Sequence, residues 1–569
     1  MINKKSGKKL GILALIALIS ASSLLFISSS NDDFKLVKSL EIYYSLFREL
    51  NLFYVDETNP EKLVENSING MLKELDPYTN YIPESDSENF NFMTTGEYGG
   101  IGSLIRRNGD FAIIAEPYEG FPAAVAGLRA GDTLVAIDGK NMEGMAISII
   151  SDNLKGAPKT PVTLTIRRYG NPDPIEISLV REKIIISNVP YFGMLDDHTG
   201  YIRLANFTTG AAKETKFALL ELRKNPSCDA IVLDLRSNPG GLLIEAVDVA
   251  NLFIPQGEEI VSTRGRVKQW DHEYRTRFSP VDTSIFVAVL VSRGSASASE
   301  IVAGSLQDLD RAVIIGQRTF GKGLVQTTRE LSYNSRLKVT TAKYYIPSGR
   351  CIQALDYSNR NEDGSVGVIP DSLISEYQTR NGRTVFDGGG IQPDFPTEAG
   401  RLNQISIALL TKNIIFDFAT VYAATNENIS PISDFEFSQE DFEEFKQLVS
   451  TRDFHYETRS EGSLKTLIDI AKREKYFELA ESEFLALESK LSHNNEKDLD
   501  NFSEEIIQLL KEEIAVRFYY QKGRMQAAIE SDPEVEKAME ILGQPGLILS
   551  TLNEPEGTIH ALNHPVLEE

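Results

Sequence analysis

The stretch from residue 285 to residue 326 constrains the fold of this chain more than any other part of the sequence. It opens with Ile285–Val291 (IFVAVLV), an apolar run rich in β-branched residues, which is typical of a strand buried on both faces. Gly294 then permits a sharp turn, and a helical pattern begins at Glu300. A strand that turns tightly into a helix leaves backbone N–H groups unpaired at the start of that helix.

This turn carries residues suited to nucleophilic catalysis. Three serines alternate with alanines in Ser295–Ser299, and Lys322 follows between two glycines. The closest histidine upstream is His272, in a polar segment, so a Ser–Lys dyad is favoured over a Ser–His–Asp relay. A buried lysine loses its proton more easily and can act as a general base. The structural alternative is that Ser297 and Glu300 form an S-x-x-E capping box and that Lys322 is an ordinary surface lysine.

The motifs GSASASEIVAGSLQD and RAVIIGQRTFGKGLVQ resemble those of the C-terminal processing (tail-specific) serine peptidases. In that family the middle serine of SASAS is the nucleophile, which falls on Ser297, and the lysine of FGKG is the general base, which falls on Lys322. The glutamine four residues later orients the lysine and falls on Gln326. The resemblance covers roughly residues 35–400 and implies an α/β multidomain protein.

Residues 183–400 are expected to form a protease core of the ClpP/crotonase-like type that the resemblance implies. Asn238–Gly241 lies between a buried strand and a helix, where glycines allow close backbone approach. In relatives this loop and the residue after the nucleophile form the oxyanion hole, which places it at Gly241, with Gly240 as a further candidate, and at Ala298. The expected strands are Gly200–Leu204, Ala230–Leu235, Glu259–Arg264, Ile285–Val291 and Lys338–Ile346, and the expected helices are Ala211–Lys224, Leu242–Phe253 and Ser299–Leu309. The polar segment Tyr357–Thr384 is expected to be an exposed excursion from the core. Gly388–Asp394 is expected to be a closing motif with a structural role.

Residues 33–95 are expected to be a helical N-terminal region, in which Asp76–Tyr81 forms a turn, and residues 96–182 resemble a PDZ domain. A glycine-rich loop lets backbone N–H groups converge on a carboxylate, and the next strand edge accepts an extended peptide. The loop expected to bind a peptide C-terminus consists of Tyr98, Gly99, Gly100, Ile101 and Gly102, beside an apolar pocket lined by Ile101 and Leu104. The alternative is a PDZ fold that serves only as a spacer.

One position in this region departs from the family pattern. Lys155 stands where many relatives have an arginine that is thought to link the PDZ domain to the active site. Lysine cannot form the planar fork of a guanidinium, so coupling between the domains is in doubt at this position.

Residues 1–30 are expected to be an export segment, either a cleaved signal peptide or a membrane anchor. Four lysines precede Leu10–Ile27, a run of apolar or small residues. Its length of about 18 residues is on the border between a cleaved signal peptide and a membrane-spanning anchor. The basic flank predicts that the rest of the chain is periplasmic or otherwise outward-facing, anchored in the inner membrane if the segment is retained.

The net charge and the cysteine content limit the kinds of partner, disulfide and metal site that the chain is expected to have. The formal net charge of −24 disfavours nucleic acid. Cys228 and Cys351 each lie beside a core-like strand, so buried free thiols are favoured over a disulfide. No Cys/His cluster suggests a metal site, and no cofactor is expected.

Residues 401–569 are expected to be a helical C-terminal region, with Gly546–Glu569 as a loop-like tail. A structural cap, a binding site for an adaptor protein and a homo-oligomer interface all stay open as roles. Helical patterns run through Leu402–Tyr422, Phe442–Val449, Ser463–Ser492 and Phe502–Ile529.

These features together predict an exported serine endopeptidase that cleaves protein substrates from or near their C-termini. Two alternatives stay open. A non-catalytic PDZ binding scaffold in the periplasm would not need Ser297, Lys322 and Gln326, and a crotonase-like acyl enzyme would not need a PDZ insertion.

Overall fold

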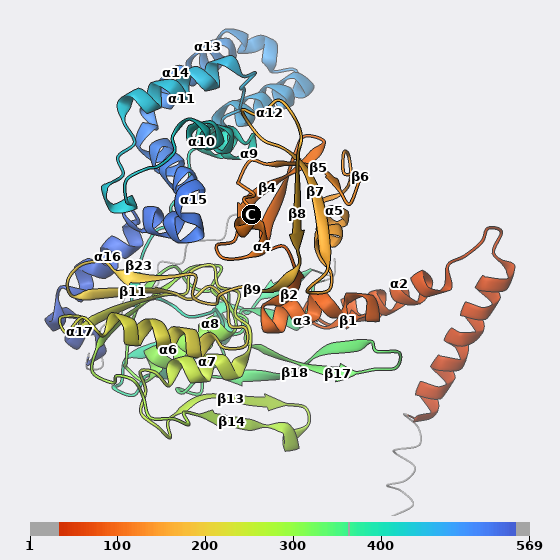
Figure 1. The fold of residues 1–569 in the computed structure, drawn as a ribbon. Coiled ribbons are helices and arrows are strands. Elements are labelled where there is room, and N and C mark those ends of the chain that lie inside the picture. The colour runs from red at the N-terminus through yellow and green to blue at the C-terminus, as the bar shows by residue number, and fades with distance from the viewer. Residues whose placement is uncertain (1–32, 362–364, 554–569) are drawn as a thin grey trace, which may run out of the picture. The chain divides into compact units, whose positions relative to one another are not determined.

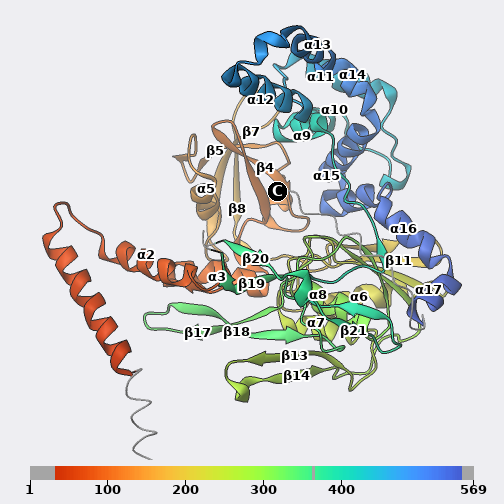
Figure 2. The same ribbon diagram turned by 180° about the vertical axis from the view of Figure 1, so that it is seen from behind.

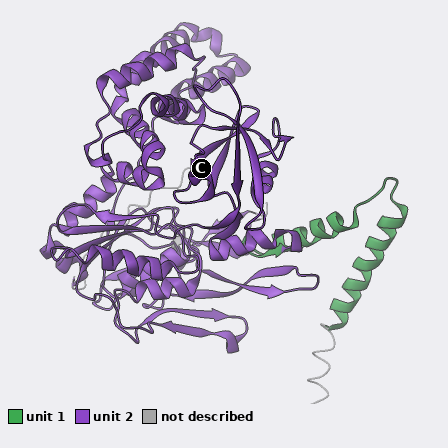
Figure 3. Ribbon diagram, viewed as in Figure 1, with its two compact units in different colours: residues 1–81 green, residues 82–569 purple. Residues whose placement is uncertain are grey.

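The computed structural model describes residues 33–361 and 365–553 of the chain. The chain divides into two compact units, Met1–Tyr81 and Ile82–Glu569 (Figure 3). The expected export segment, residues 1–30, lies outside the described residues. Within the described ranges no single helix is long and apolar enough to cross a membrane; α9 (Gln404–Thr411) and α10 (Ile414–Thr425) reach that length and apolarity only as a pair bent by 62°.

The first unit is helical, as the sequence predicts. Residues 33–53 form one helix and α2 spans Pro60–Lys73, where the Asn59 side chain caps the first turn by accepting from the Lys62 N–H at 3.0 Å. The expected turn after α2 is present, because the Asp76 carboxylate accepts from the Tyr78 N–H at 2.8 Å and from the Thr79 N–H at 2.9 Å. The strand β1 (Asn80–Ile82) follows this turn.

The second unit contains the α/β core that the sequence predicts. Its central sheet runs in the order β10-β11-β12-β15-β16-β23; β10 is antiparallel to β11, and the other neighbours are parallel. Two of its strands, β11 and β23, are labelled in Figure 1. Both cysteines are free, with Cys228 buried and Cys351 half-buried. The elements are β10 (Tyr191–Met194), β11 (Thr199–Arg203), α6 (Ala211–Leu222), β12 (Ala230–Asp234), α7 (Leu243–Ala250), β15 (Phe286–Val291), α8 (Ala298–Asp308), β16 (Val313–Gly316) and β23 (Phe395–Pro396).

The two faces of the central sheet are covered by helices from different parts of the chain. Alternate strand residues point to opposite faces, so Ile231 and Leu233 pack in one core with α6, α7 and α8. Ala230 and Val232 pack in a second core with α16 (Pro533–Leu542) and α17 (Pro545–Leu552). The end of the C-terminal region is therefore a layer of the α/β core, and burial on both faces explains why β15 is apolar throughout and β12 is apolar up to Asp234.

The expectation that Gly546–Glu569 is a loop-like tail is wrong for its first part, which belongs to α17. Pro545 occupies the first turn of α17, where a missing N–H has no cost, and Ile548 is 1% exposed against the sheet. Residues 554–569 lie outside the described part of the chain.

An antiparallel sheet beside α8 carries the segment after Lys322. It contains β13 (Glu259–Gly265), β14 (His272–Arg275), β17 (Leu324–Glu330) and β18 (Arg336–Tyr345). Short hairpins lie in the segment Tyr357–Thr384, the expected excursion. The closing motif Gly388–Asp394 has a structural role, because the Asp394 carboxylate accepts from the Gln307 and Arg383 side chains and from the Ile314 N–H. The remaining elements are η2 (Lys268–Trp270), β19 (Leu355–Arg360), β20 (Val366–Val368), η3 (Asp371–Leu373), β21 (Glu376–Gln378) and β22 (Thr384–Phe386).

The PDZ-like region is an antiparallel sheet in the order β3-β4-β5-β7-β8, with α5 against β3. Asp138 and Gly139 form a hairpin turn between β5 and β6, with φ of 48° and 75°, as an Asp-Gly pair favours. Two strands flank this sheet in the chain and pair with each other, β2 (Glu97–Gly100) and β9 (Glu182–Ile185). The other elements are η1 (Glu84–Asp86), α3 (Ser87–Thr95), β3 (Ser103–Asn108), β4 (Phe111–Pro117), α4 (Pro122–Val125), β5 (Thr133–Ile137), β6 (Lys140–Asn141), α5 (Ile147–Leu154), β7 (Pro161–Arg167) and β8 (Ile175–Val180).

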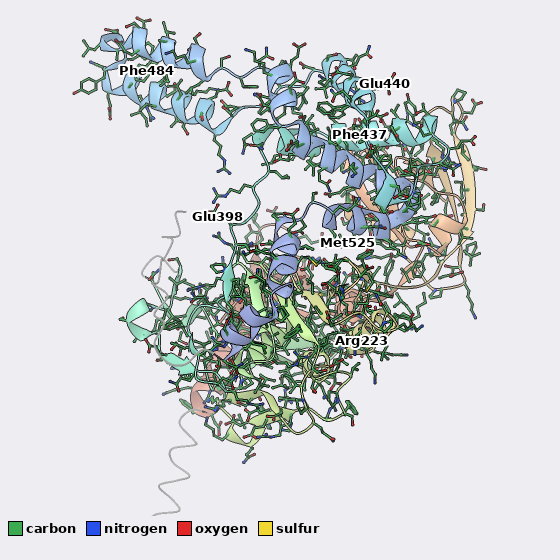
Figure 4. All side chains as sticks on the ribbon, turned by 90° about the vertical axis from the view of Figure 1, so that its left-hand side faces the viewer. Arg223, Glu398, Phe437, Glu440, Phe484 and Met525 are labelled. Carbon is green, nitrogen blue, oxygen red and sulfur yellow. The ribbon has the colours of Figure 1, made fainter. Side chains whose placement is uncertain are left out.

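The C-terminal region leaves the α/β core and returns to it. Figure 4 shows Glu398 on the outgoing segment and Met525 on the returning helix, and Figure 2 shows α10 and α15 beside β4. The returning helix, α15 (Ser503–Ile529), is kinked at Tyr520, whose φ is 53°. The expected helix over Ser463–Ser492 is interrupted between α12 and α13. The remaining elements are η4 (Ile432–Asp434), α11 (Gln439–Thr451), α12 (Arg459–Glu474), η5 (Phe477–Leu479), α13 (Glu481–Leu491) and α14 (Asn495–Asn501).

Because α16 completes the core, replacing Ile541 with alanine is expected to lower the free energy of unfolding by about 2–5 kcal/mol. Ile541 is 0% exposed and packs on the central sheet. The measurement is a urea titration of the full chain, with the exposed Glu540→Ala on the same helix as control. A loss below about 0.5 kcal/mol would show that α16 adds little to the core.

Candidate active site

Ser297 lies on the turn between β15 and α8 in a strained backbone conformation. Its φ is 55° and its ψ −112°, a combination that residues with a side chain rarely adopt. Ser297 is half-buried, at the N-terminus of α8. Strain of this kind persists only where surrounding contacts hold it, and it is common at functional sites.

The two neighbouring serines have structural partners. The Ser295 hydroxyl donates to the Leu235 carbonyl at 2.8 Å, and the Ser299 hydroxyl donates to the Asn238 carbonyl at 2.9 Å. Both serines are 0% exposed, so both hydroxyls are used to fix the turn to the loop after β12. Of the three serines, the middle one, Ser297, is therefore the one that is only half-buried, and its role as nucleophile stays a prediction.

A buried carboxylate joins the serine turn to the lysine segment. Glu300, 0% exposed, accepts from the Ser297 N–H at 2.8 Å and from the Lys322 N–H at 2.9 Å. Its other contacts are the Gly321 N–H at 2.7 Å and the Thr319 hydroxyl at 2.6 Å. The structure thus brings the backbones of Ser297 and Lys322 to one side chain, although 25 residues separate them in the sequence.

The environment of Glu300 is strongly desolvated. Burial raises the pKa of Glu300, and hydrogen bonds from Thr319 and three backbone N–H groups oppose that rise. Tyr344, on β18, donates its hydroxyl to the Ser297 carbonyl at 3.2 Å, and burial raises the pKa of Tyr344. The turn is therefore held from two sides by buried polar groups.

The glycine loop after β12 contacts the serine turn closely. Gly240 has φ of 95°, and a Cβ at this position would lie 2.8 Å from the Ala298 nitrogen and 2.9 Å from the Ser297 Cβ, so the close approach requires glycine. The Gly240 N–H donates to the Asn238 side chain at 2.9 Å. Because this N–H already has a partner, Gly240 is a weaker oxyanion donor than Gly241.

The other two expected oxyanion donors lie at favourable positions. Ala298 is the first residue of α8, where N–H groups have no partner within the helix. The bridge between Gly241 and Phe207 uses the Gly240 carbonyl and the Leu242 N–H, which leaves the Gly241 N–H outside it.

Lys322 lies on the segment that enters β17, and Gln326 lies within β17. Lys322 is half-buried between two buried glycines. The Gly323 N–H donates to the Gln353 side chain at 2.8 Å, which fixes the segment after the lysine. Gln326 follows a bulge in the β17–β18 ladder and donates its amide to the Thr340 hydroxyl at 3.2 Å.

The PDZ-like region contains a pocket of about 150 Å³ between β3 and α5. Ile101 lines it as expected, but Leu104 does not, because it lies on the other face of β3 and is 49% exposed. Ser103 and Ile105 line the pocket instead, and a bulge between Leu104 and Ile105 shifts the register of the strand. Lys155, at the end of α5, also lines this pocket.

The expected carboxylate loop is partly a strand. Tyr98, Gly99 and Gly100 belong to β2 and pair with Ile184, Lys183 and Glu182. Ile101 and Gly102 form the turn that leads into β3. The Tyr98 ring lines the pocket and packs edge-on against Phe92, with ring centroids 5.5 Å apart.

Reasoning from the sequence missed the role of Glu300 beyond capping. The S-x-x-E spacing identifies it as a partner of the Ser297 N–H, and that hydrogen bond is present. Its contacts with Thr319, Gly321 and Lys322 depend on the tertiary fold and leave no local pattern.

Comparisons with known proteins agree with this arrangement. Residues 198–372 match the peptidase family S41, residues 113–168 match the PDZ domain, and residues 405–542 match the "Probable PDZ-protease, C-terminal helical domain". A carboxy-terminal-processing protease of Bartonella bacilliformis is 37% identical over 363 residues, which cover 63% of this chain and 80% of that protein.

Two further relatives were found. A probable CtpA-like serine protease of Staphylococcus aureus is 34% identical over 385 residues, covering 65% of this chain and 73% of that protein. Among solved structures, a photosystem II D1 C-terminal processing protease matches with 30% identity and a TM-score of 0.32, over 58% of this chain and 85% of that one. With a curated relative matched over most of its length, the chain belongs to the S41 family of serine peptidases, together with the carboxy-terminal-processing proteases.

Proposed function

We propose that this chain is an exported endopeptidase that recognises the C-termini of protein substrates and cleaves them with a Ser297–Lys322 dyad. The observation that carries the proposal is the Glu300 carboxylate, which fixes the backbones of both residues. The strained Ser297 turn and the structural hydrogen bonds of Ser295 and Ser299 support the same choice of nucleophile.

In this mechanism neutral Lys322 takes the proton from the Ser297 hydroxyl as Ser297 attacks the scissile carbonyl. The N–H groups of Gly241 and Ala298 stabilise the oxyanion, each by about 3 kcal/mol. Gln326 orients the lysine. Collapse of the intermediate breaks the scissile C–N bond, and protonated Lys322 gives its proton to the leaving amine, which leaves an acyl-enzyme on Ser297. Water, activated by Lys322 as general base, then hydrolyses the ester and frees Ser297.

The PDZ domain delivers the substrate. A free carboxylate binds at the turn Ile101–Gly102, where backbone N–H groups converge, and the last side chain enters the pocket beside it. Support comes from the pocket between β3 and α5, whose lining includes Ile101, Ile105 and Leu154. An apolar C-terminal residue suits this lining, while the unpartnered Ser103 hydroxyl in the wall also accommodates a polar group.

Substrates with a free C-terminus are expected to be cleaved with a kcat/KM roughly 10-fold higher than matched C-terminal amides. Hydrogen bonds to a charged carboxylate are about twice as strong as those to a neutral amide. The comparison uses unfolded proteins long enough to reach both sites, together with short peptides that reach Ser297 unaided as control. Equal kcat/KM for acid and amide would remove the PDZ delivery step and leave the dyad untouched.

Export rests on the sequence of the N-terminus. Four lysines precede the apolar run Leu10–Ile27, which suits an export signal or an inner-membrane anchor with the protease outward-facing. N-terminal sequencing of protein recovered from the cell envelope separates a cleaved signal from a retained anchor.

A further inference from the structure

The N-terminus of α16 bonds to three separate segments at one edge of the central sheet, which follow β12, β16 and β23. Glu534 is 9% exposed, and its Oε2 accepts from the Arg236 guanidinium at 2.7 Å. Its Oε1 accepts from the Thr397 hydroxyl at 2.7 Å and from the Gln317 side-chain amide. The two oxygens of one buried carboxylate therefore hold different parts of the protease core.

Two of these segments, those of Arg236 and Gln317, lead directly into the candidate active site. Arg236 follows β12 and precedes the glycine loop at Asn238–Gly241, which contacts Ser297. Gln317 follows β16 and precedes Thr319, whose hydroxyl donates to Glu300. In the sheet, β12 and β16 lie on either side of β15, the strand that leads into the turn with Ser297. The Glu534 side chain thus connects the loop after β12 to the loop after β16, on either side of β15.

The Arg236 end of this bridge is rigidly held. Its guanidinium contacts Asp234 through Nε at 3.0 Å and Nη2 at 2.6 Å, and Asp532 through Nη1 at 2.7 Å. Asp234 is 0% exposed and also pairs with Arg203 at 2.6 Å. A bidentate arginine with several charged partners has little freedom to move.

We propose that Glu534 is a positioning residue, which sets the oxyanion loop and the lysine segment at their correct separation around Ser297. This inference rests on the proposed Ser297–Lys322 chemistry. A glutamine at position 534 cannot accept on both sides, because its NH₂ group would face either Arg236 or the donors of Gln317 and Thr397. Displacement of a reacting group by about 1 Å can cost roughly 10²-fold in rate.

The test compares Glu534→Gln and Gln317→Ala with wild type in the full chain. The matched control is Glu536→Gln, an exposed position on the same helix. The measurements are kcat and KM on an unfolded test protein with a free apolar C-terminus, the rate of Ser297 labelling by a fluorophosphonate, and the thermal midpoint. Gln317→Ala removes one arm only, so it provides a folded variant if Glu534→Gln is unstable.

We expect kcat and the labelling rate to fall roughly 10- to 100-fold in both variants, with KM changed less than about threefold. Unchanged kcat per folded molecule, or a loss matched by the fraction unfolded, would overturn the positioning role. If wild type hydrolyses the test protein no faster than Ser297→Ala, the proposed function itself fails, which is a different outcome from equal activity of wild type and the position 534 variant.

Discussion

Replacing Ser297 with alanine is expected to lower kcat by roughly 10⁵-fold or more, and Lys322→Ala by a similar factor. Without the hydroxyl no acyl-enzyme forms, and without the lysine no base removes its proton. The losses in kcat from substitutions at residues that act as one unit do not add, so the double variant is expected to be no slower than either single variant. The measurement is steady-state hydrolysis of an unfolded protein substrate.

Suitable controls are Ser227→Ala and Lys224→Ala, both at exposed positions of the core. A general base acts only when unprotonated, so wild-type activity is expected to rise with pH. A folded Lys322→Ala variant with near wild-type turnover would rule out this lysine as the base, and a pH profile that is flat from mildly acidic to alkaline conditions would argue against it.

Replacing Glu300 with glutamine is expected to reduce kcat by roughly 10²-fold and the free energy of unfolding by about 2–4 kcal/mol. Each carboxylate oxygen accepts from two donors: one from Thr319 and Gly321, the other from Ser297 and Lys322. The amide NH₂ of glutamine must face one of these pairs, whose donors then lose their acceptor. Glu440→Gln, at an exposed position on α11, is the control.

The pH dependence separates the effect of Glu300 on activity from its effect on stability. Burial raises the pKa of Glu300, so acidification protonates it earlier than an ordinary glutamate, and one oxygen then stops accepting. Activity should fall on the acid side. Stability should not fall through this group, because a raised folded-state pKa contributes stability at low pH that is lost as the pH rises through it. The Glu300→Gln variant should lack this acid limb; an unchanged limb would assign it to another group.

The site could be predicted where its signals are local in the sequence. The buried strand, the turn and the helix around Ser297 follow from residue types and periodicity, and the structure places them within one or two residues of the expected bounds. The side-chain roles of Ser297 and Lys322 stay predictions, with the resemblance and the geometry as their support. The relation of Glu300 to the lysine segment could not be predicted, since it depends on how residues about 20 apart in sequence meet in space.

Two features of the fold differ from the expectation for separate reasons. Side chains alternate along a strand, so Ile101, Ser103 and Ile105 share the pocket face, whereas Leu104 points to the other side. An amphipathic helix shows that one face is buried but not what covers it, so nothing in α16 indicated that it packs on the central sheet. The helical start at Pro545 did have a local signal, a proline at the first helical turn before an apolar run.

A ribosome makes the chain from its N-terminus, so the helices α16 and α17 are made after the strands that they cover. Arg236 and Asp532 are 296 residues apart, so at about 5–20 residues per second the strands of the sheet exist for roughly 15–60 s before their second cover is made. During that interval one face of the sheet is bare and the glycine loop and lysine segment lack the carboxylate that joins them. On the proposed role of Glu534, the carboxylate that positions the candidate site is therefore made after every strand of the central sheet.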